Sequence, residues 1–217
     1  MIEGIAAATV HGRYLALPPA TPGPAPLLVG FHGYAEDAEA QLERLQSIPG
    51  SADWLLVSIQ GLHRFYQRRM DRVVANWMTR QDRERAIADN IAFVATCLDA
   101  VAAAWPTLPH AVFAGFSQGV AMAFRAAVHS TRGCAGVIAA GGDVPPEITA
   151  EQLRRIPTVL LARGTADGLY PKEQFGKDSL RLRDCAVPHR ALEFEGGHEW
   201  SGEVSAAAAE LLRRSRA

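Results

Sequence analysis

Three residues in the second half of the chain have the types and the order that acyl transfer through a covalent intermediate requires. Ser117 is the centre of GFSQG (residues 115–119), a G-x-S-x-G pattern. An apolar run precedes the pattern and a segment with helical spacing follows it, which is the context in which this serine is a nucleophile. The helix dipole at such a turn favours developing negative charge. We expect Ser117 to be the nucleophile; the alternative is a serine that only caps the following helix.

A serine hydroxyl needs a base to accept its proton. His198 follows the last apolar run, in EGGHEW, and is the last of seven histidines. This position fits the order Ser…Asp…His that accompanies the G-x-S-x-G pattern, so we expect His198 to be the base. Glu199 is expected at the rim of the site. A surface or packing role is expected for His11, His110, His129 and His189.

The base in turn needs an acid that orients its ring. Asp167, in RGTADGLYP, lies 50 residues after Ser117 and 31 before His198. These spacings fit one strand–helix–strand unit and one short crossover. The alternative acid is Asp143, in GGD after the preceding apolar run, and we favour Asp167.

Acyl transfer also needs two hydrogen-bond donors aimed at the developing oxyanion. One is expected from the backbone N–H of Gln118, directly after the candidate nucleophile. The other is expected from FHGYA (residues 31–35), where the backbone N–H of Tyr34 is the candidate. His32, in the same loop, is expected to be a hydrogen-bonded structural residue.

Short apolar runs alternate with longer segments that have helical spacing. The apolar runs predict strands covered on both faces and span residues 27–32, 54–60, 111–115, 135–141, 158–164 and 191–196. The helical segments cover residues 35–47, 82–105, 118–129, 172–185 and 203–215. The alternation predicts an α/β fold with a mostly parallel central sheet and helices on both faces. Ligand sites in such sheets lie at the carboxyl ends of the strands, which is where the candidate residues fall.

The length of 217 residues, 48% of them hydrophobic, suits one domain over residues 1–217 with a sizeable core. Its first 26 residues are expected to hold one or two edge strands (within 5–16) and a connector with five prolines (17–26). No insertion is long enough for a large cap domain. The longest stretch without a predicted element, 61–81, is expected to overhang the site. It carries a cluster of arginines, expected to be a solvated face and alternatively an attractant for an anionic substrate: Arg64, Arg68, Arg69 and Arg72.

The 22 basic and 23 acidic residues give a net charge of −1, which leaves no electrostatic footprint for nucleic acid. Cys97, Cys134 and Cys185 have neither the number of a disulfide framework nor the spacing of a zinc site. We therefore expect no metal and no cofactor. No signal-sequence pattern is present, and no apolar run approaches the roughly 18–20 residues of a membrane span. A cytoplasmic protein without an integral membrane segment is expected, and a homodimer is left open.

Four segments in order, LLVGFHGYAEDAE, AGFSQGVAMA, LLARGTADGLYP and FEGGHEW, resemble the α/β-hydrolase superfamily. Within it they are most similar to the phospholipase/carboxylesterase family of small, lidless serine esterases. The resemblance runs from about residue 27 to the end. It implies the α/β-hydrolase fold and the same roles for Ser117, Asp167, His198, Tyr34 and Gln118. The sequence departs from the family at Val120, where a second glycine is usual, and in the loop after His32–Gly33, which is often richer in glycine.

The leading hypothesis is a serine carboxylic-ester hydrolase that acts on small or medium acyl esters. An acyl-thioesterase or a lysophospholipase would use the same triad, and acyl-chain preference would separate these activities. A dienelactone-type hydrolase usually has cysteine as its nucleophile. A binding protein on the same fold is the remaining alternative, which the complete Ser/Asp/His set disfavours. Phe116, Leu169, Tyr170 and Trp200 are adjacent to the candidate catalytic residues and are expected to line the pocket. Trp77 resembles the family's tryptophan in this region, and the resemblance implies that it also lines the pocket.

Overall fold

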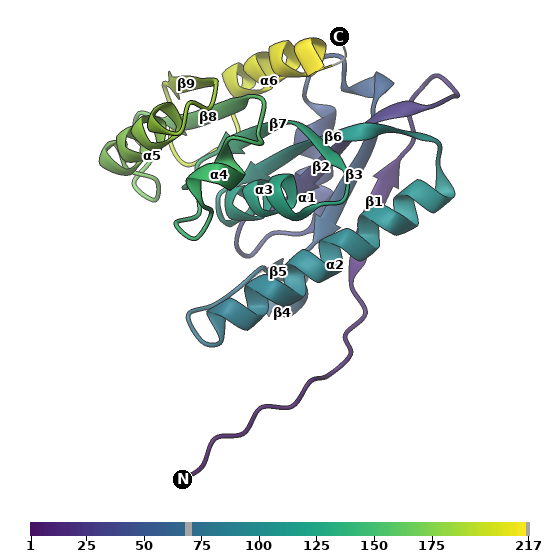
Figure 1. Ribbon diagram of the computed structural model, residues 1–217, viewed down its shortest axis with the longest axis vertical. Helices are drawn as coiled ribbons and strands as arrows, with labels where there is room; N and C mark the ends of the chain where they lie inside the picture. Colours follow the sequence, from purple (N-terminus) through teal and green to yellow (C-terminus); the bar gives the residue numbers. More distant parts are fainter. Residues whose placement is uncertain (68–70, 216–217) are drawn as a thin grey trace.

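The computed structural model describes residues 1–67 and 71–215, and a seven-stranded sheet forms its centre (Figure 1). The strand order is β1-β3-β2-β6-β7-β8-β9. The strands are β1 Arg13–Leu17, β2 Ala25–Phe31, β3 Leu55–Gln60, β6 Thr107–Phe116, β7 Gly133–Ala140, β8 Val159–Gly164 and β9 His189–Phe194. Only β1 is antiparallel to its neighbour, β3. The prediction of a mostly parallel sheet is confirmed.

Helices cover both faces of this sheet, as predicted. They are α1 Ala38–Gln46, α2 Arg83–Ala104, α3 Gln118–His129, α4 Ala150–Leu153, α5 Lys172–Asp184 and α6 Gly202–Ser215. Helices α2, α3 and α5 share one hydrophobic cluster with one face of the sheet, and α1 and α6 share another with the opposite face. Helix α6 follows the last strand. In the described residues, the connections between the sheet strands contain the other five helices, a short 3-10 helix (Ser51–Asp53) and a small hairpin, without a cap domain.

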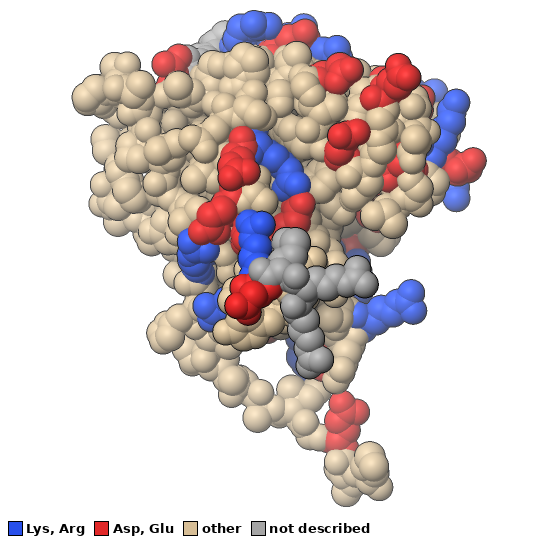
Figure 2. All heavy atoms as spheres, turned by 180° about the vertical axis from the view of Figure 1, so that it is seen from behind, with Lys and Arg blue, Asp and Glu red and all other residues tan. Residues whose placement is uncertain are grey.

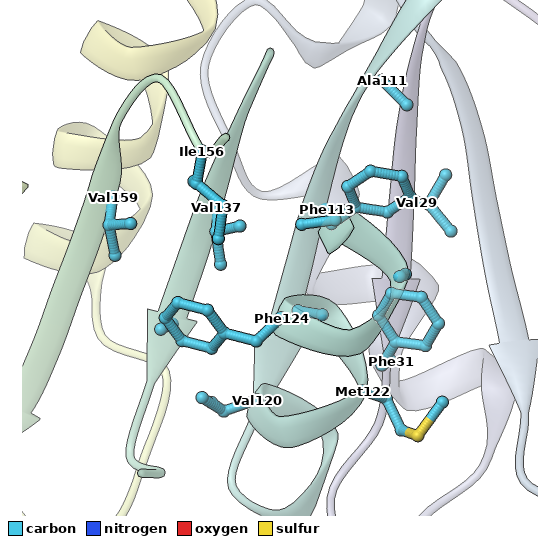
Figure 3. Packing of buried hydrophobic residues seen from close by; sticks show 14 of the residues in the cluster. Val29, Phe31, Ala111, Phe113, Val120, Met122, Phe124, Val137, Ile156 and Val159 are labelled. Atoms are coloured by element: carbon cyan, nitrogen blue, oxygen red, sulfur yellow. The ribbon is translucent and has the colours of Figure 1, made fainter. Parts of the chain in front are cut away.

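The strands read as continuous apolar runs because side chains on both of their faces are buried. Leu28 belongs to the cluster under α1 and α6, while Leu27 and Val29 belong to the cluster under α2, α3 and α5. Figure 3 shows Val120 and Phe124 of α3 lying against the side chains of the strands in this larger cluster. Each such side chain contributes about 1.5–3 kcal/mol when it is fully buried.

The N-terminal part forms a single edge strand. β1 overlaps only the end of the segment predicted to hold one or two strands, and residues 1–12 have no regular structure. Figure 1 shows this segment running away from the body of the protein. The proline-rich connector joins β1 to β2, and β2 begins at Ala25, within the predicted connector.

Helix α2 is long and apolar enough to cross a membrane when judged by length and composition alone, contrary to the sequence expectation. Its buried residues lie three or four positions apart, from Ala86 and Asn90 to Val94, Leu98 and Val101. The last three belong to the larger core cluster. This stripe is the pattern of a helix packed on one face against a core.

An unpredicted hairpin lies within residues 61–81. It consists of β4 His63–Gln67 and β5 Arg72–Asn76, which pair antiparallel, and Ala75 also forms a β-bridge with Glu36. Of the arginine cluster, Arg68 and Arg69 lie outside the described residues. Arg64 bonds the backbone oxygen of His11, and Arg72 pairs with Asp37 at 2.6 Å. On the face shown in Figure 2, basic and acidic side chains are likewise interspersed.

Candidate active site

Ser117 occupies a sharp turn between the end of β6 and the start of α3. Its φ is +53°, in a region that residues other than glycine rarely adopt. A Cβ on Gly119 would lie 2.0 Å from the carbonyl oxygen of Phe31, and one on Gly115 would lie 2.4 Å from the carbonyl oxygen of Gly119. The two glycines of the pattern therefore allow the turn to pack directly against the neighbouring backbone.

The ring of His198 lies between Ser117 and Asp167. Its Nε2 is 2.8 Å from Ser117 Oγ, and its Nδ1 is 2.8 Å from Asp167 Oδ2. Because an ionised carboxylate can only accept, Nδ1 donates to Asp167, and Nε2 is left to accept the hydroxyl proton of Ser117. The ring also packs on Phe116, with 5.0 Å between centroids.

Asp167 is a buried carboxylate that accepts three hydrogen bonds. It is 4% exposed, and its Oδ1 accepts 2.9 Å hydrogen bonds from the backbone N–H groups of Leu169 and Tyr170. These bonds fix the direction in which Oδ2 faces His198. Asp143, the alternative acid, is exposed, and both ring nitrogens of His198 are already bonded to other residues.

The chain topology explains why residues so distant in sequence meet. Ser117, Asp167 and His198 follow β6, β8 and β9, which all run parallel in one sheet. The loops at the carboxyl ends of such strands gather at one edge of the sheet.

In the loop after β2, the backbone N–H of Tyr34 has no hydrogen-bond partner among the described residues. The N–H of Gly33 donates to Glu36 Oε2 at 2.7 Å, and that of Ala35 donates to the oxygen of Ala75 at 3.0 Å. Between them, the Tyr34 N–H makes no hydrogen bond to a described residue, and the same holds for the Gln118 N–H at the start of α3. Both candidate oxyanion donors are therefore available to a ligand.

The side chain of Gln118 has a role that sequence reasoning missed. Its Oε1 accepts from the N–H of Trp77 and its Nε2 donates to the oxygen of Met78, each at 2.9 Å. It thereby ties the residue after the candidate nucleophile to the segment that follows β5. The sequence marks this residue only as part of Gly-Phe-Ser-Gln-Gly. It does not reveal the side-chain contacts, because the partners lie about 40 residues away along the chain.

The side chains of Trp77 and His32 are buried and hydrogen-bond to backbone groups of the loops around the site. Trp77 is fully buried and its indole N–H donates to the oxygen of His32 at 2.8 Å, so its expected place in the pocket wall is wrong. His32 Nε2 accepts from the N–H of Gly61, and Nδ1 donates to the oxygen of Gly33. Burial lowers the pKa of His32, which keeps the ring neutral and structural, as the sequence predicts.

A cleft of about 410 Å³ opens beside His198. Its lining residues are Glu36, Ala40, Glu43, Arg44, Ser47, Phe116, His198, Glu199 and Trp200. Phe116 and Trp200, two of the residues expected near the substrate, lie in this wall. Tyr170 is not, because its ring is buried and its hydroxyl bonds Asp178, and Leu169 is 78% exposed and outside the wall. The cleft is of a size that takes a small organic ligand, and four of its nine lining residues are charged.

Within the described residues, no three histidine, cysteine or acidic side chains form a group that could hold a metal ion. The three cysteines are free thiols. Burial raises the pKa of both Cys97 and Cys134 to about 12, so these two are protonated and unreactive at neutral pH.

The parallel sheet and the turn after β6 define an α/β-hydrolase. The family model of phospholipases and carboxylesterases matches residues 21–214, so the chain belongs to that family and is a hydrolase. No curated protein sequence matches it significantly.

Three solved structures illustrate the shared fold. The carboxylesterase of Bacillus cereus is 16% identical with a TM-score of 0.73, over 94% of each chain. The acyl-protein thioesterase 2 of Zea mays is 16% identical with a TM-score of 0.72, over 95% of this chain and 100% of its own. A phospholipase/carboxylesterase from Dyadobacter fermentans is 18% identical with a TM-score of 0.69, over 96% and 100%. At these identities the likeness is one of fold.

Proposed function

We propose that this chain is a serine hydrolase of small or medium carboxylic esters, with Ser117 as nucleophile, His198 as base and Asp167 as orienting acid. The observation that carries the proposal is the unbroken hydrogen-bond series from Ser117 Oγ through the His198 ring to Asp167. Each member has the partner and the geometry that its role needs.

In the acylation step, Ser117 Oγ attacks the acyl carbon while His198 Nε2 takes the hydroxyl proton. The imidazolium that forms is stabilised by Asp167, and the oxyanion accepts hydrogen bonds from the N–H groups of Tyr34 and Gln118. The C–O bond to the alcohol then breaks as His198 returns the proton to the leaving oxygen. Water, deprotonated by His198, hydrolyses the acyl-enzyme in the same way and releases the acid.

The lining of the cleft supports small or medium substrates. Glu36, Arg44 and Glu199 contribute charge to its wall, and a long acyl chain gains little from burial against charged groups. A lysophospholipase would use the same triad, and preferential turnover of the decanoate ester would favour it. An acyl-thioesterase remains the second candidate, because the same triad cleaves a thioester and because one solved structure with this fold is an acyl-protein thioesterase.

The test is hydrolysis of p-nitrophenyl acetate, butyrate and decanoate, with butyrylthiocholine as the thioester. We expect saturable turnover of acetate and butyrate that disappears in Ser117→Ala. Asp167→Asn should lower kcat by about 10³–10⁴-fold, while Asp143→Asn, its matched control, should stay near wild type. Turnover that persists in Ser117→Ala, or a wild type that shows neither turnover nor labelling at Ser117 by a fluorophosphonate, would contradict the proposal.

A further inference from the structure

The loop that carries the Tyr34 N–H is held in a conformation that its sequence does not favour. Ala35 has a φ of +57°, in the left-handed region that glycine adopts far more readily than residues with a Cβ. A residue with a Cβ stays in this region only where its surroundings hold it there. The contacts that hold this loop therefore bear on the direction of the Tyr34 N–H.

One side of the loop is held by backbone. Ala35 N–H donates to the oxygen of Ala75, and the N–H of Ala75 donates to the oxygen of Glu36 at 2.8 Å. These two bonds attach the loop to strand β5 of the hairpin. They fix the positions of Ala35 and Glu36 and leave the start of the loop, at Gly33, to be held by another group.

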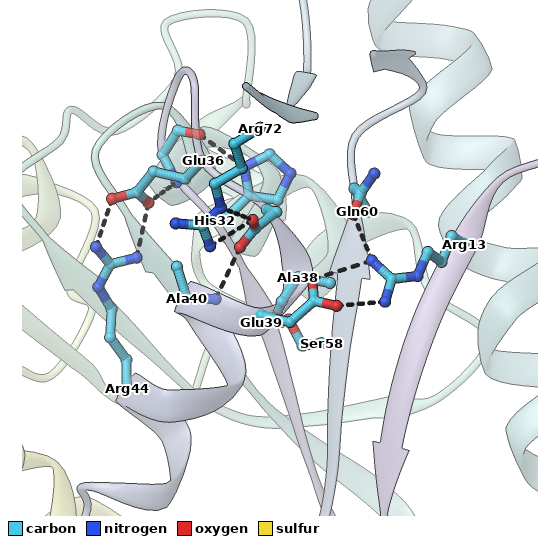
Figure 4. Close-up of polar contacts among 12 residues, drawn as sticks. Arg13, His32, Glu36, Ala38, Glu39, Ala40, Arg44, Ser58, Gln60 and Arg72 are labelled. Atoms are coloured by element: carbon cyan, nitrogen blue, oxygen red, sulfur yellow. Dashed lines mark hydrogen bonds and ion pairs between the residues drawn. The ribbon is translucent and has the colours of Figure 1, made fainter. Parts of the chain in front are cut away.

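That group is the carboxylate of Glu36, which turns back over its own loop (Figure 4). Oε2 accepts from the Gly33 N–H at 2.7 Å and from Arg44 Nη1 at 2.7 Å, and Oε1 accepts from Arg44 Nη2 at 2.5 Å. Burial alone would raise the pKa of Glu36, but the Arg44 guanidinium lowers it overall, so the carboxylate stays ionised. A planar, bidentate pair of this kind is specific to arginine.

Arg44 also reaches the other side of the candidate oxyanion site. Its guanidinium lies 4.1 Å from the centroid of the Phe116 ring, and Phe116 directly precedes Ser117 and packs on the His198 ring. Arg44, on α1, thus spans from the loop with the Tyr34 N–H to the turn with the Gln118 N–H. It contacts neither of the two N–H groups itself.

The geometry points to Arg44 as a positioning residue for the oxyanion hole, acting through the Glu36 carboxylate that holds the Gly33 N–H. This inference rests on the proposed function, because it assigns the Tyr34 N–H to the oxyanion. It predicts that Arg44 contributes to the transition state and hardly at all to ground-state binding. Its loss therefore lowers kcat and leaves KM nearly unchanged.

The experiment compares Arg44→Gln, Arg44→Lys and Glu36→Gln on p-nitrophenyl butyrate. We expect kcat to fall about 10–100-fold in Arg44→Gln and Glu36→Gln, less than the full loss of an oxyanion donor, with KM within about twofold. Arg44→Lys keeps the charge without the bidentate fork and should recover part of the loss. A trifluoromethyl ketone, whose adduct carries an oxyanion, should lose affinity by the same factor as kcat. The matched control is Arg13→Gln, which removes an exposed ion pair to Glu39 of the same helix.

Each alternative has a distinct result. A rise in KM with kcat unchanged would make Arg44 a substrate contact and overturn the inference, as would wild-type kinetics in Arg44→Gln. If Arg44→Gln does not fold, Arg44→Lys decides, because it must show the same selective loss in kcat. Wild-type turnover that survives Ser117→Ala would instead overturn the proposed function, and this inference with it.

Discussion

The hydroxyl of Tyr170 donates a 2.8 Å hydrogen bond to Asp178 Oδ2, while the backbone N–H of the same residue donates to Asp167 Oδ1. Tyr170 therefore connects helix α5 to the carboxylate that faces His198. Burial raises the pKa of Tyr170 and also that of Asp178, and both groups are enclosed in the core. The loop with the candidate acid is thus attached to a rigid helix by a buried polar pair.

Removing this hydroxyl should destabilise the protein. In Tyr170→Phe, the buried Asp178 carboxylate loses a donor that nothing replaces, and we expect a loss of about 1–3 kcal/mol in the free energy of unfolding. Urea denaturation measures it, and Tyr66→Phe is the control because Tyr66 is 70% exposed. Equal unfolding free energies for the two variants would show that the pair does not support the loop.

The ion pair between Glu36 and Arg44 predicts a stability that depends on acid pH. The pKa of Glu36 in the folded chain lies below its ordinary value of 4.5, so the folded state stabilises the ionised carboxylate relative to the unfolded chain. The stabilisation is complete above that ordinary value and is lost as the pH falls through the folded pKa. The unfolding free energy of wild type should therefore exceed that of Glu36→Gln most above about pH 5, and the difference should shrink below about pH 4. A difference that stays constant from pH 7 to pH 3 would rule this linkage out.

Much of the sheet could be predicted because buried parallel strands leave an unmistakable pattern. All six apolar runs became strands, and the candidate triad residues follow three of them. The β4–β5 hairpin was missed because its strands are short and half exposed, so neither hydrophobic alternation nor a continuous run marks them. Helix α4 was missed although Thr149 and Gln152 form a capping box that the sequence displays.

The pocket wall was harder to predict than the triad, because nearness in sequence does not give the direction of a side chain. Tyr170 is close to Asp167 in sequence, and Trp77 was chosen from the family resemblance, yet both side chains point into the core and donate to buried acceptors there. Arg44, which does line the cleft, had no signal beyond an ordinary charged position on a surface helix. Only the structure shows that Arg44 pairs with the Glu36 carboxylate and lies over the Phe116 ring.

Arg125 and Glu147 form an ion pair in which only the guanidinium is buried. Removing Glu147 should therefore destabilise the protein more than removing Arg125. Arg125 is 1% exposed and bonds Glu147 Oε1 through Nε at 2.8 Å, whereas Glu147 is 37% exposed. Glu147→Ala leaves a buried charge without its partner and should cost about 1–3 kcal/mol, below the range for fully buried pairs. Arg125→Met leaves only a carboxylate that water can reach and should cost less. Urea denaturation of the two variants at pH 7 checks this order, and the reverse order would contradict it.

The end of helix α5 offers a stabilising substitution away from the cleft. Ala186 has a φ of +57°, its N–H bonds the oxygen of Arg183, and the N–H of Val187 bonds that of Leu182, which together form a Schellman motif. Glycine normally occupies this position, because it adopts positive φ without the penalty of a Cβ. Ala186→Gly should therefore raise the free energy of unfolding by about 0.5–1 kcal/mol and leave kcat unchanged. The control is Ala88→Gly in the exposed interior of α2, where the same change should cost about 1 kcal/mol. Chemical denaturation of both variants measures the change in the free energy of unfolding, which should be positive for Ala186→Gly and negative for Ala88→Gly. A loss of stability in Ala186→Gly would show that the extra conformational entropy of glycine in the unfolded chain outweighs the relief of strain at this position.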